Sequence, residues 1–184
     1  MALSLPERLQ TQRLVLREPR EADAARIFDA YTQDLDVARH MVWRPHRHVS
    51  ETEAFMTWCM QAWSSGRSRP YVLAYRDHAT IPIGMLEARL FLSPTVDIGY
   101  VLQRASWGAG LMSEAMDAFS SAALAQPDCY RVQATCDTEN HASARVLEKS
   151  GFVKEGEARA YLKINGAWAD HILFGLVSDD VAVS

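Results

Sequence analysis

The chain has 184 residues, of which 48% are hydrophobic and 23% charged, so it holds enough apolar material for the core of one globular domain. Its net charge of −4 gives no electrostatic reason to expect binding to nucleic acid. No apolar run approaches the roughly 18–20 residues of a membrane span, and Met1–Leu9 lacks the apolar stretch of a signal peptide. The three cysteines stand at irregular spacing, which fits a reducing compartment and not a disulfide framework. We therefore expect a cytoplasmic protein without a nucleic-acid or membrane partner.

The first part of the chain alternates between strand-like and helix-like segments. Alternating polar and apolar residues predict a strand at Arg13–Arg17, and an apolar face predicts a helix over Asp23–Gln33. A connector rich in Trp, His and Arg follows at Met41–His48. Ser50–Glu53 fits a capping box, which predicts a helix that starts there and stops before Gly66.

Three extended segments come next, at Tyr71–Tyr75, Ile81–Leu92 and Val96–Leu102. The turn-forming sequences Asp77–Thr80 and Ser93-Pro94 separate them. Short turns between consecutive strands predict an antiparallel meander in this part of the chain.

The rest of the chain returns to alternating strands and helices after a glycine-containing turn at Trp107–Gly110. Its predicted elements are a helix from about Leu111 to Ala125, a strand at Tyr130–Cys136, a helix at Asn140–Ser150, and strands at about Val153–Leu162 and Trp168–Val177. The resulting order β-α-α-β-β-β-α-β-α-β-β predicts an α/β (α+β) domain.

The turn before the third helix has the composition of an anion site. Residues 108–113 read Gly-Ala-Gly-Leu-Met-Ser, and glycines allow backbone N–H groups to approach an anion closely. The helix start adds a partial positive charge, which suits a pyrophosphate, although such a glycine pair also occurs as a plain tight turn. Two known phosphate loops are excluded, because Ser113 replaces the third glycine of a dinucleotide fingerprint and the chain lacks a Gly-Lys-Ser/Thr sequence.

A second motif covers the fourth predicted helix, Asn140–Phe152. Asn140 is a good N-cap, Gly151 stands where a left-handed C-terminal residue is wanted, and Phe152 can pack back on the helix. Helix capping explains these three residues, but it does not explain Ser143 in the first turn.

Together the two motifs resemble hallmarks of the GNAT acetyltransferase superfamily. Tyr100–Ala115, with its Ile98-Gly99-Tyr100 lead-in and Trp-Gly-x-Gly-x-x-x-Glu-Ala core, is similar to the acetyl-CoA loop of the RimJ/RimL-type branch. Asn140–Phe152 is similar to that branch's second hallmark, at a suitable distance downstream. One departure is Ala105, where the superfamily's broader loop pattern has Gln or Arg.

The resemblance spans about residues 9–178, because Thr11–Arg17 and Asp170–Gly175 also match the pattern of the branch. It implies one N-acetyltransferase domain over residues 1–184. The expected fold is a mixed, mostly antiparallel twisted sheet of about seven strands, flanked by about four helices. Two central strands of this sheet are expected to splay apart and hold the cofactor between them.

The resemblance also implies an enzyme that uses acetyl-CoA as co-substrate and needs no metal. A neutral amine would attack the thioester directly in a ternary complex, and the acceptor would be a small-molecule amine or a protein or peptide N-terminus. A homodimer is compatible with this branch. Other readings stay open: a catalytically silent acyl-CoA-binding or sensing protein, a transferase for another acyl-CoA such as succinyl-CoA, and, more distantly, a nucleotide-dependent oxidoreductase.

The implied cofactor site lies where Val96–Leu102 splays from Tyr130–Cys136, with Leu102 as a backbone partner of pantetheine. The N–H groups of residues 108–113 would hold the pyrophosphate. Arg145 and Lys149 would add charge near the phosphates or keep an exposed helix soluble. The implied cofactor-binding residues are Leu102, Trp107, Gly108, Ala109, Gly110, Leu111, Met112, Ser113, Asn140, Ser143, Arg145 and Lys149.

The resemblance assigns Ser143 a hydrogen bond to the departing thiolate and lets Asn140 position pantetheine or the acceptor. A lysine-like amine is mostly protonated at neutral pH, so a base or a water relay must take its proton. Asp97 and Glu87 are the candidate bases, and either is alternatively a solvated strand residue.

The acceptor wall is expected at Trp43–His48, in the connector before the second helix. Glu87 and Tyr100 are the further predicted acceptor contacts, and Trp43 is alternatively a core residue. His46 and His48 form no metal pair, because no Cys or acidic partner stands at ligand spacing.

Overall fold

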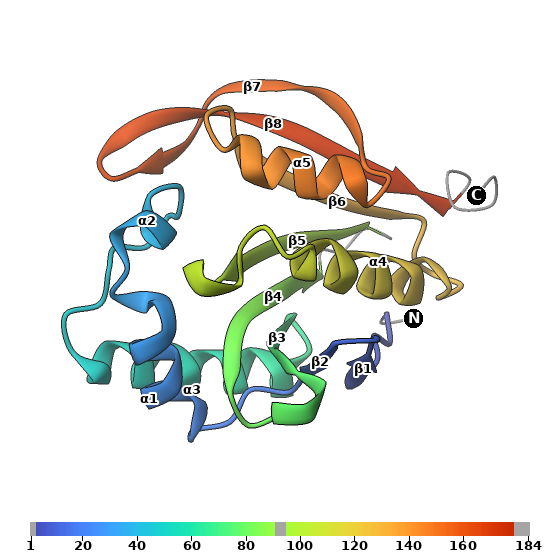
Figure 1. Ribbon diagram of the computed structural model, residues 1–184. Helices are drawn as coiled ribbons and strands as arrows, with labels where there is room; N and C mark the ends of the chain where they lie inside the picture. Colours follow the sequence, from blue (N-terminus) through green and yellow to red (C-terminus); the bar gives the residue numbers. More distant parts are fainter. Residues whose placement is uncertain (1–2, 91–94, 179–184) are drawn as a thin grey trace.

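The computed structural model describes residues 3–90 and 95–178, and its frame is an open eight-stranded sheet (Figure 1). The strands lie in the order β1 (Arg8–Gln10), β2 (Leu14–Arg17), β3 (Ser68–Tyr75), β4 (Pro82–Leu90), β5 (Thr95–Leu102), β6 (Arg131–Asp137), β8 (Ala167–Val177) and β7 (Val153–Ile164). All neighbours are antiparallel except β5 and β6, which run parallel. The expected mixed, mostly antiparallel sheet is therefore confirmed.

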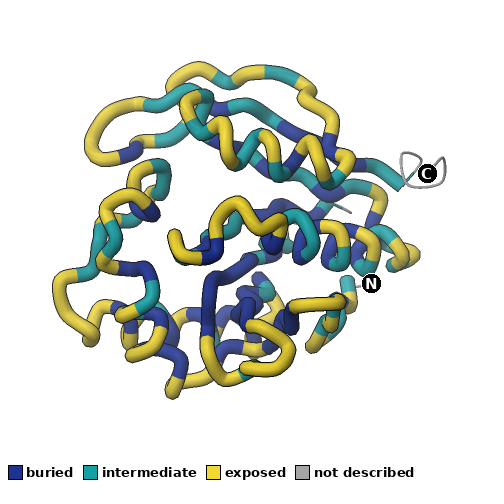
Figure 2. The backbone as a smooth tube through the Cα atoms, viewed as in Figure 1, coloured by how far each residue is buried: buried dark blue, intermediate teal, exposed yellow. Residues whose placement is uncertain are grey.

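The helices cover the sheet on both faces. They are α1 (Asp23–Ile27), α2 (Leu35–Ala38), α3 (Val49–Ser65), α4 (Leu111–Leu124) and α5 (His141–Lys149), with a π-helical turn after α1 (Phe28–Thr32). One hydrophobic cluster lies between the sheet and α4 and α5, and a second lies under α1 and α3. Figure 2 shows buried residues concentrated in the central strands and on the inner helix faces. No helix in the described part of the chain is long and apolar enough to cross a membrane.

The predicted element order is confirmed, with three local differences. The short edge strand β1 and the short helix α2 were not predicted, because each has too few residues for a periodic pattern. The predicted helix over Asp23–Gln33 changes to a π-helical turn at Phe28. The predicted turn Ser93-Pro94 lies outside the described residues, and so does the end of the strand expected over Ile81–Leu92.

The capping box expected at Ser50–Glu53 is wrong in register. Helix α3 begins at Val49 with His48 as its N-cap, and Glu51 is the acidic third residue. The Glu51 carboxylate accepts the backbone N–H groups of Arg47 and His48 at 2.8 and 3.0 Å. A carboxylate that satisfies two free N–H groups selects this earlier start over the Ser50 register.

The two central strands diverge after a short parallel ladder, as expected. Pairing between β5 and β6 ends at Ile98 and Ala134. Beyond that point β5 pairs only with β4, up to Leu102, and β6 pairs only with β8. The N–H of Gln103 bonds the Ile83 carbonyl of β4, and alternate strand residues point their backbone groups to opposite sides. The backbone groups of Leu102 and, two residues earlier, Tyr100 therefore point into the gap.

Candidate active site

A cavity of about 520 Å³ opens where β5 and β6 diverge. Four parts of the chain line it: the segment around α2, the end of β5, the loop and first turn of α4, and one side of α5. The lining residues are Asp36, Val37, Arg39, His40, Met41, Tyr100, Val101, Leu102, Ser106, Trp107, Gly108, Gly110, Leu111, Met112, Ser113, Asn140, Ala142, Ser143, Arg145, Val146 and Lys149. The cavity therefore joins the two sequence motifs and adds a wall from the N-terminal half.

The loop before α4 presents backbone N–H groups to this cavity. Gly108 and Gly110 have φ values of +73° and +72°, a conformation that side chains other than glycine rarely adopt. Gly110 is the N-cap and has no side chain to cap the helix. The first helical bond runs from the Glu114 N–H to the Gly110 carbonyl, which leaves the N–H groups of residues 111–113 without a helical acceptor. These donors and the helix dipole form an anion site.

Glu114 anchors the loop to the N-terminal strands. Its carboxylate accepts the Thr11 hydroxyl at 2.5 Å and the Arg13 Nε at 2.6 Å. Arg13 also donates to the Ala109 carbonyl at 2.9 Å, so one guanidinium ties the loop and the helix together. Burial alone raises the pKa of Glu114, but the hydrogen bonds from Thr11 and Arg13 lower it below its usual value. These contacts explain the Glu of the Trp-Gly-x-Gly-x-x-x-Glu-Ala motif, which is Glu114.

A hydroxyl pair lies where α5 faces β5. The Asn140 side chain caps α5 by accepting the Ser143 N–H at 3.1 Å, which confirms it as the N-cap. The hydroxyls of Ser143 and Tyr100 lie 2.6 Å apart. Burial raises the pKa of Tyr100, so its phenol stays protonated and can donate. The pair is therefore a hydrogen-bond donor at the cavity wall.

The α5 side of the cavity is cationic. Arg145 and Lys149 are exposed and line the cavity four residues apart on α5. Neither forms an ion pair with another residue in the described part of the chain. Two unpaired cations near an anion-binding helix start are well placed for phosphates.

The sequence profile of the Acetyltransferase (GNAT) domain family matches residues 13–153. The chain belongs to the GNAT acetyltransferase family.

The relatives of this GNAT acetyltransferase place it in the RimJ/RimL-type branch. It is 30% identical over 183 residues to the [ribosomal protein uS5]-alanine N-acetyltransferase of Escherichia coli, with 94% of this chain and 92% of that protein covered. It is 42% identical over 86 residues to the probable N-acetyltransferase YjcK of Bacillus subtilis, a match that covers 47% of this chain and 48% of YjcK. The chain thus spans about half of YjcK but nearly all of the uS5-alanine enzyme.

The fold of this GNAT acetyltransferase is shared with RimL, the ribosomal L7/L12 α-N-protein acetyltransferase, solved in complex with coenzyme A. The TM-score is 0.82 at 20% identity, and the match covers 96% of this chain and 98% of that chain. Together with the family match, the named N-acetyltransferase relatives make the protein an acetyl-CoA-dependent acetyltransferase.

Of the twelve predicted cofactor residues, eleven line the cavity of this acetyltransferase. Ala109 does not line it, because its carbonyl turns to Arg13. Leu102 lines the cavity, and its carbonyl already accepts the Trp107 indole N–H at 2.7 Å. Its own N–H points into the gap, so the backbone contact expected from Leu102 rests on that donor.

Neither predicted carboxylate base of the acetyltransferase lines the cavity. Successive strand residues face opposite sides, so Asp97 lies on the face opposite to Tyr100. Asp97 pairs with Arg89 directly across the β4–β5 ladder, with Arg89 Nε at 2.8 Å. Glu87 lies on the same face as Asp97, 3.8 Å from Arg89. The structure thus brings the two carboxylates to an arginine and not to the hydroxyl pair.

Trp43, the predicted start of the acceptor wall, does not line this cavity. Trp43 is half-buried and packs with the hydrophobic cluster under α1 and α3, with its ring centroid 5.8 Å from that of His46. The residues that line the cavity on this side are Asp36, Val37, Arg39, His40 and Met41. Tyr100, the remaining predicted acceptor contact, lines the cavity beside Ser143.

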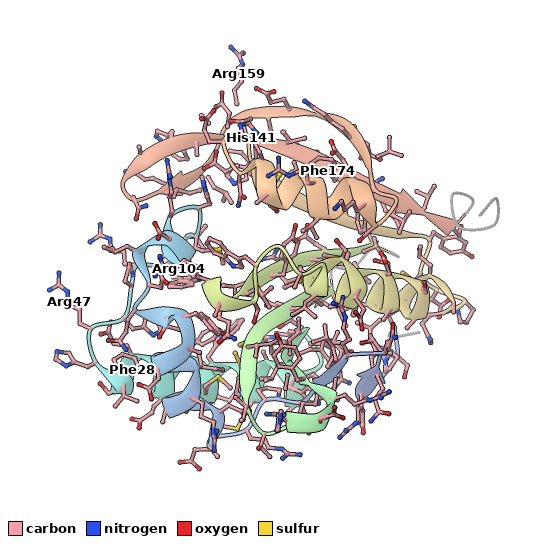
Figure 3. All side chains as sticks on the ribbon, viewed as in Figure 1. Phe28, Arg47, Arg104, His141, Arg159 and Phe174 are labelled. Atoms are coloured by element: carbon pink, nitrogen blue, oxygen red, sulfur yellow. The ribbon has the colours of Figure 1, made fainter. Side chains whose placement is uncertain are left out.

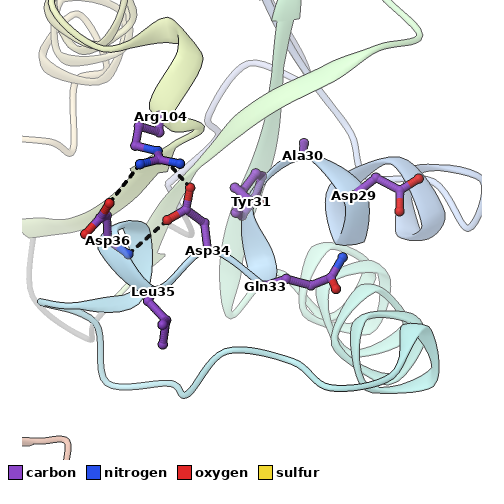
Figure 4. A pocket seen from close by; sticks show the side chains of 8 residues that line it. All are labelled: Asp29, Ala30, Tyr31, Gln33, Asp34, Leu35, Asp36 and Arg104. Atoms are coloured by element: carbon purple, nitrogen blue, oxygen red, sulfur yellow. Dashed lines mark hydrogen bonds and ion pairs between the residues drawn. The ribbon is translucent and has the colours of Figure 1, made fainter.

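A second hollow of about 540 Å³ adjoins the cavity through Asp36, which lines both. Figure 4 shows Arg104 at its edge, between Asp34 and Asp36. The guanidinium lies 3.1 Å from Asp34 and 2.9 Å from Asp36, and it ties the start of the cofactor loop to α2. Figure 3 shows Arg104 at this junction, whereas Arg47 and Arg159 project away from the molecule.

Sequence reasoning missed His40 and Asp137. The His40 Nδ1 lies 2.9 Å from the Asp137 carboxylate, which stands at the end of β6. These residues are 97 positions apart, and no local pattern marks either one. Burial alone raises the pKa of Asp137, but its hydrogen bonds with His40 and the Glu139 N–H lower it below its usual value.

No cysteine is available as an acyl-accepting thiolate. Cys59, Cys129 and Cys136 are all buried and free. Burial raises the pKa of Cys136 to about 11, although a hydrogen bond with Ser143 opposes that effect. Burial also raises the pKa of Cys59 to about 12. The thiols stay protonated at neutral pH, which favours direct transfer over a covalent acyl-cysteine route.

No three His, Cys, Asp or Glu side chains gather as a metal site within residues 3–90 and 95–178.

Proposed function

We propose that the protein transfers the acetyl group of acetyl-CoA directly to a primary amine, of a small molecule or a protein N-terminus, in a ternary complex. The observation that carries this proposal is the cavity between β5 and β6, which joins an anion-binding helix start to the Tyr100–Ser143 hydroxyl pair. A phosphate-binding end and a hydrogen-bond-donating wall in one cavity suit a CoA thioester.

The residues present fit coenzyme A. The free N–H groups of residues 111–113 and the cations Arg145 and Lys149 would hold the phosphates. The backbone groups of Tyr100 and the N–H of Leu102 point into the gap beside β5, where pantetheine would lie as an added strand. When bound, acetyl-CoA supplies the acetyl group as a thioester.

Ser143, backed by Tyr100, would protonate or hydrogen-bond the departing thiolate. The 2.6 Å contact orients the Ser143 hydroxyl, and because burial raises the pKa of Tyr100, the phenol stays protonated and can donate a hydrogen bond. A thiol has a pKa near 8.5, so thiolate is already a fair leaving group and the assistance is modest. Asn140 contributes by capping α5 and thereby positioning Ser143.

The amine class of the acceptor is supported by the relatives. The Escherichia coli relative acts on an alanine of ribosomal protein uS5, and RimL is named as an α-N-protein acetyltransferase. On that basis we propose an α-amino group of a protein or a comparable small-molecule amine as the acceptor. It would enter beside Val37–Met41, the cavity wall that lies outside the cofactor loop and α5.

Thermal unfolding with and without acetyl-CoA tests the cofactor half of the proposal. A ligand at 100 times its Kd adds about 2.7 kcal/mol of stability, which raises Tm by several degrees in a domain of this size. We expect such a shift with acetyl-CoA and none with NADH or adenosine. No shift at millimolar acetyl-CoA contradicts the proposal, and a shift with NADH alone favours an oxidoreductase.

Release of free CoA thiol tests the transfer half. Acceptors are offered as a panel of α-amino peptides, small primary amines and ε-amino lysine derivatives, with a hydroxyl compound as control. Amine-dependent thiol release and an acetylated product in the mass spectrum are expected. Binding of acetyl-CoA without any amine-dependent release indicates a silent acyl-CoA-binding protein, and faster release from succinyl-CoA indicates a different acyl donor.

A further inference from the structure

The candidate bases predicted from sequence, Asp97 and Glu87, lie on the face of the sheet opposite to Tyr100 and do not line the cavity, so the acceptor's proton needs another destination. His40 is the one imidazole among the described residues that line the cavity. It stands just after α2, in the wall assigned above to the acceptor. Its neighbourhood is therefore the place to look for the base.

The hydrogen bond to Asp137 selects the tautomer of His40. The Asp137 carboxylate has a lowered pKa, is ionised at neutral pH, and can only accept hydrogen bonds. The His40 Nδ1, 2.9 Å away, must therefore carry the proton and donate it. In the neutral ring, Nε2 is then an unprotonated acceptor.

Asp137 is held in place behind the ring. One of its oxygens accepts the Glu139 N–H at 2.9 Å and the other accepts from His40. Its side chain is 11% exposed and it does not line the cavity, whereas the His40 side chain is 21% exposed and does. No described group is bonded to the His40 Nε2. The pair thus presents one free basic nitrogen from a fixed ring.

The segment that carries His40 is fastened on both sides of the cavity. The Asn165 side chain, at the β7–β8 turn, donates to the Arg39 carbonyl at 3.3 Å. Arg104 holds Asp36 from the cofactor loop. Figure 1 shows α2 between α1 and the β7–β8 hairpin. His40 is therefore positioned by contacts to two separate parts of the fold.

Resting on the proposed function, we propose that His40 is the general base of the transfer and that Asp137 is its positioning residue. A free imidazole has a pKa near 6.5, which is far better matched to an α-amino group of pKa about 7.7–8.0 than to a lysine amine of about 10.4. On this proposal, α-amino and similarly weak amines are expected to react faster than lysine amines.

Each of the three protons of the acceptor ammonium has a destination. One proton of the acceptor ammonium passes to the His40 Nε2 and then to solvent, which frees the nitrogen lone pair. The N–C bond to the acetyl carbonyl forms and the C–S bond breaks. A second ammonium proton ends on the CoA sulfur, through Ser143 or directly, and the third stays on the amide product.

Several ionisable groups surround the ring. Asp137 on β6 contacts it, and His171 on β8 stands opposite Asp137 in the β6–β8 ladder. The other ionisable residues that line the cavity are Asp36, Arg39, Tyr100, Arg145 and Lys149. Of all these, only His40 and His171 are imidazoles, and His171 is buried beside Tyr161. If the base is an imidazole, kcat/KM should fall as the pH is lowered, and this acidic limb should be lost in the His40 variant.

The decisive variant is His40→Asn. The asparagine side-chain nitrogen takes the place of Nδ1, so the hydrogen bond donated to Asp137 is kept. The basic nitrogen Nε2 is lost. The measurement is kcat/KM for an α-amino acceptor from pH 5.5 to 9, together with the Tm shift caused by acetyl-CoA. We expect kcat/KM to fall by about 10²–10⁴-fold. The pH profile of kcat/KM should lose the acidic limb that comes from the imidazole, and the Tm shift caused by acetyl-CoA should be unchanged. His78→Gln, at an exposed turn, is the matched control and should behave as the wild type.

Two further variants separate catalysis from structure. Asp137→Asn removes the negative charge that favours the protonated ring, so the acidic limb of the kcat/KM profile should move to lower pH. In His40→Ala, added imidazoles should restore activity in proportion to their base strength, which filling of a hole would not produce. If His40→Asn no longer binds acetyl-CoA, the rescue of His40→Ala by imidazoles tests whether His40 is the general base.

Each outcome has one meaning. If the wild type releases thiol and His40→Asn keeps rate and pH profile within about threefold, the His40 proposal is overturned and the proposed function stands. Absence of rescue in His40→Ala, in a variant that binds acetyl-CoA, also overturns it. If the wild type releases no thiol with any amine, the proposed function and the His40 assignment fall together.

Discussion

The two sides of the cavity are built in different ways. The cofactor side consists of contiguous segments, the loop with the first turn of α4 and the first turns of α5, and it acts mainly through backbone N–H groups. The side proposed for the acceptor joins His40 after α2 to Asp137 at the end of β6, a contact between two side chains. Backbone sites leave local marks such as glycines and caps, whereas side-chain sites between distant segments leave none. The proposed cofactor side is therefore marked in the sequence, and the proposed acceptor side is not.

Apart from the His40 variants, the largest effect on this comparison is expected from the cofactor loop. Gly110→Val puts a β-branched residue at φ +72°, which costs about 1–3 kcal/mol and displaces the first turn of α4. The Kd for acetyl-CoA should rise by about tenfold to a hundredfold, measured by calorimetry. Gly66→Val is the matched control, because Gly66 has φ +69° at the end of α3 and does not line the cavity. Equal loss of affinity in both variants would show that general destabilisation is the cause.

A smaller effect is expected at the hydroxyl pair. Ser143→Ala removes the group proposed to assist the leaving thiolate, and kcat should fall by about tenfold, because a thiolate needs little assistance. Tyr100→Phe removes only the partner 2.6 Å behind it and should have a weaker effect. The Kd for acetyl-CoA should change little in either variant. A loss of binding without a loss of kcat would instead make Ser143 a cofactor contact.

The pH dependence of stability sharpens the comparison further. Folding lowers the pKa of Glu114 on the cofactor side, so its stabilisation is complete above its unfolded pKa, near 4.3–4.5, and is lost as the pH falls through the folded value. Tm should therefore drop between about pH 5 and 3. Glu114→Gln should have a lower Tm at pH 7 and a shallower decline. Parallel curves for the two proteins would contradict the role of this carboxylate.

The smallest effect is expected at Arg104, which joins the two sides. Its side chain is 61% exposed, and exposed ion pairs contribute about 0.2–1 kcal/mol each. Arg104→Ala should raise KM for the acceptor by less than about tenfold and leave the Kd for acetyl-CoA unchanged. An altered acetyl-CoA affinity would mean that the ion pairs of Arg104 with Asp34 and Asp36 also hold the cofactor loop in place.

Part of the site could not be predicted because strand faces depend on register. Asp97 and Glu87 were predicted as bases from their places in strands near the cofactor loop. The β4–β5 register puts Asp97 opposite Arg89 and turns both carboxylates to the other face of the sheet. A shift of one residue would have turned Glu87 to the other face, and the strand sequences alone do not carry that register. The face of Asp97, three residues before Tyr100 on the same strand, follows from strand alternation alone.

The sequence by itself determined the order of the elements, the cofactor loop and the capped helix of the second motif. These features depend on neighbouring residues: Gly108, Gly110 and Gly151 adopt positive φ, and Asn140 bonds a backbone N–H three residues on. Only the tertiary structure decided that Tyr100 meets Ser143, that His40 meets Asp137, and that Val37, Arg39, His40 and Met41 line the cavity while Trp43 does not. The physical reason is that such contacts form where the β5–β6 ladder ends and helices from both halves of the chain pack around the gap, and no local propensity specifies that packing.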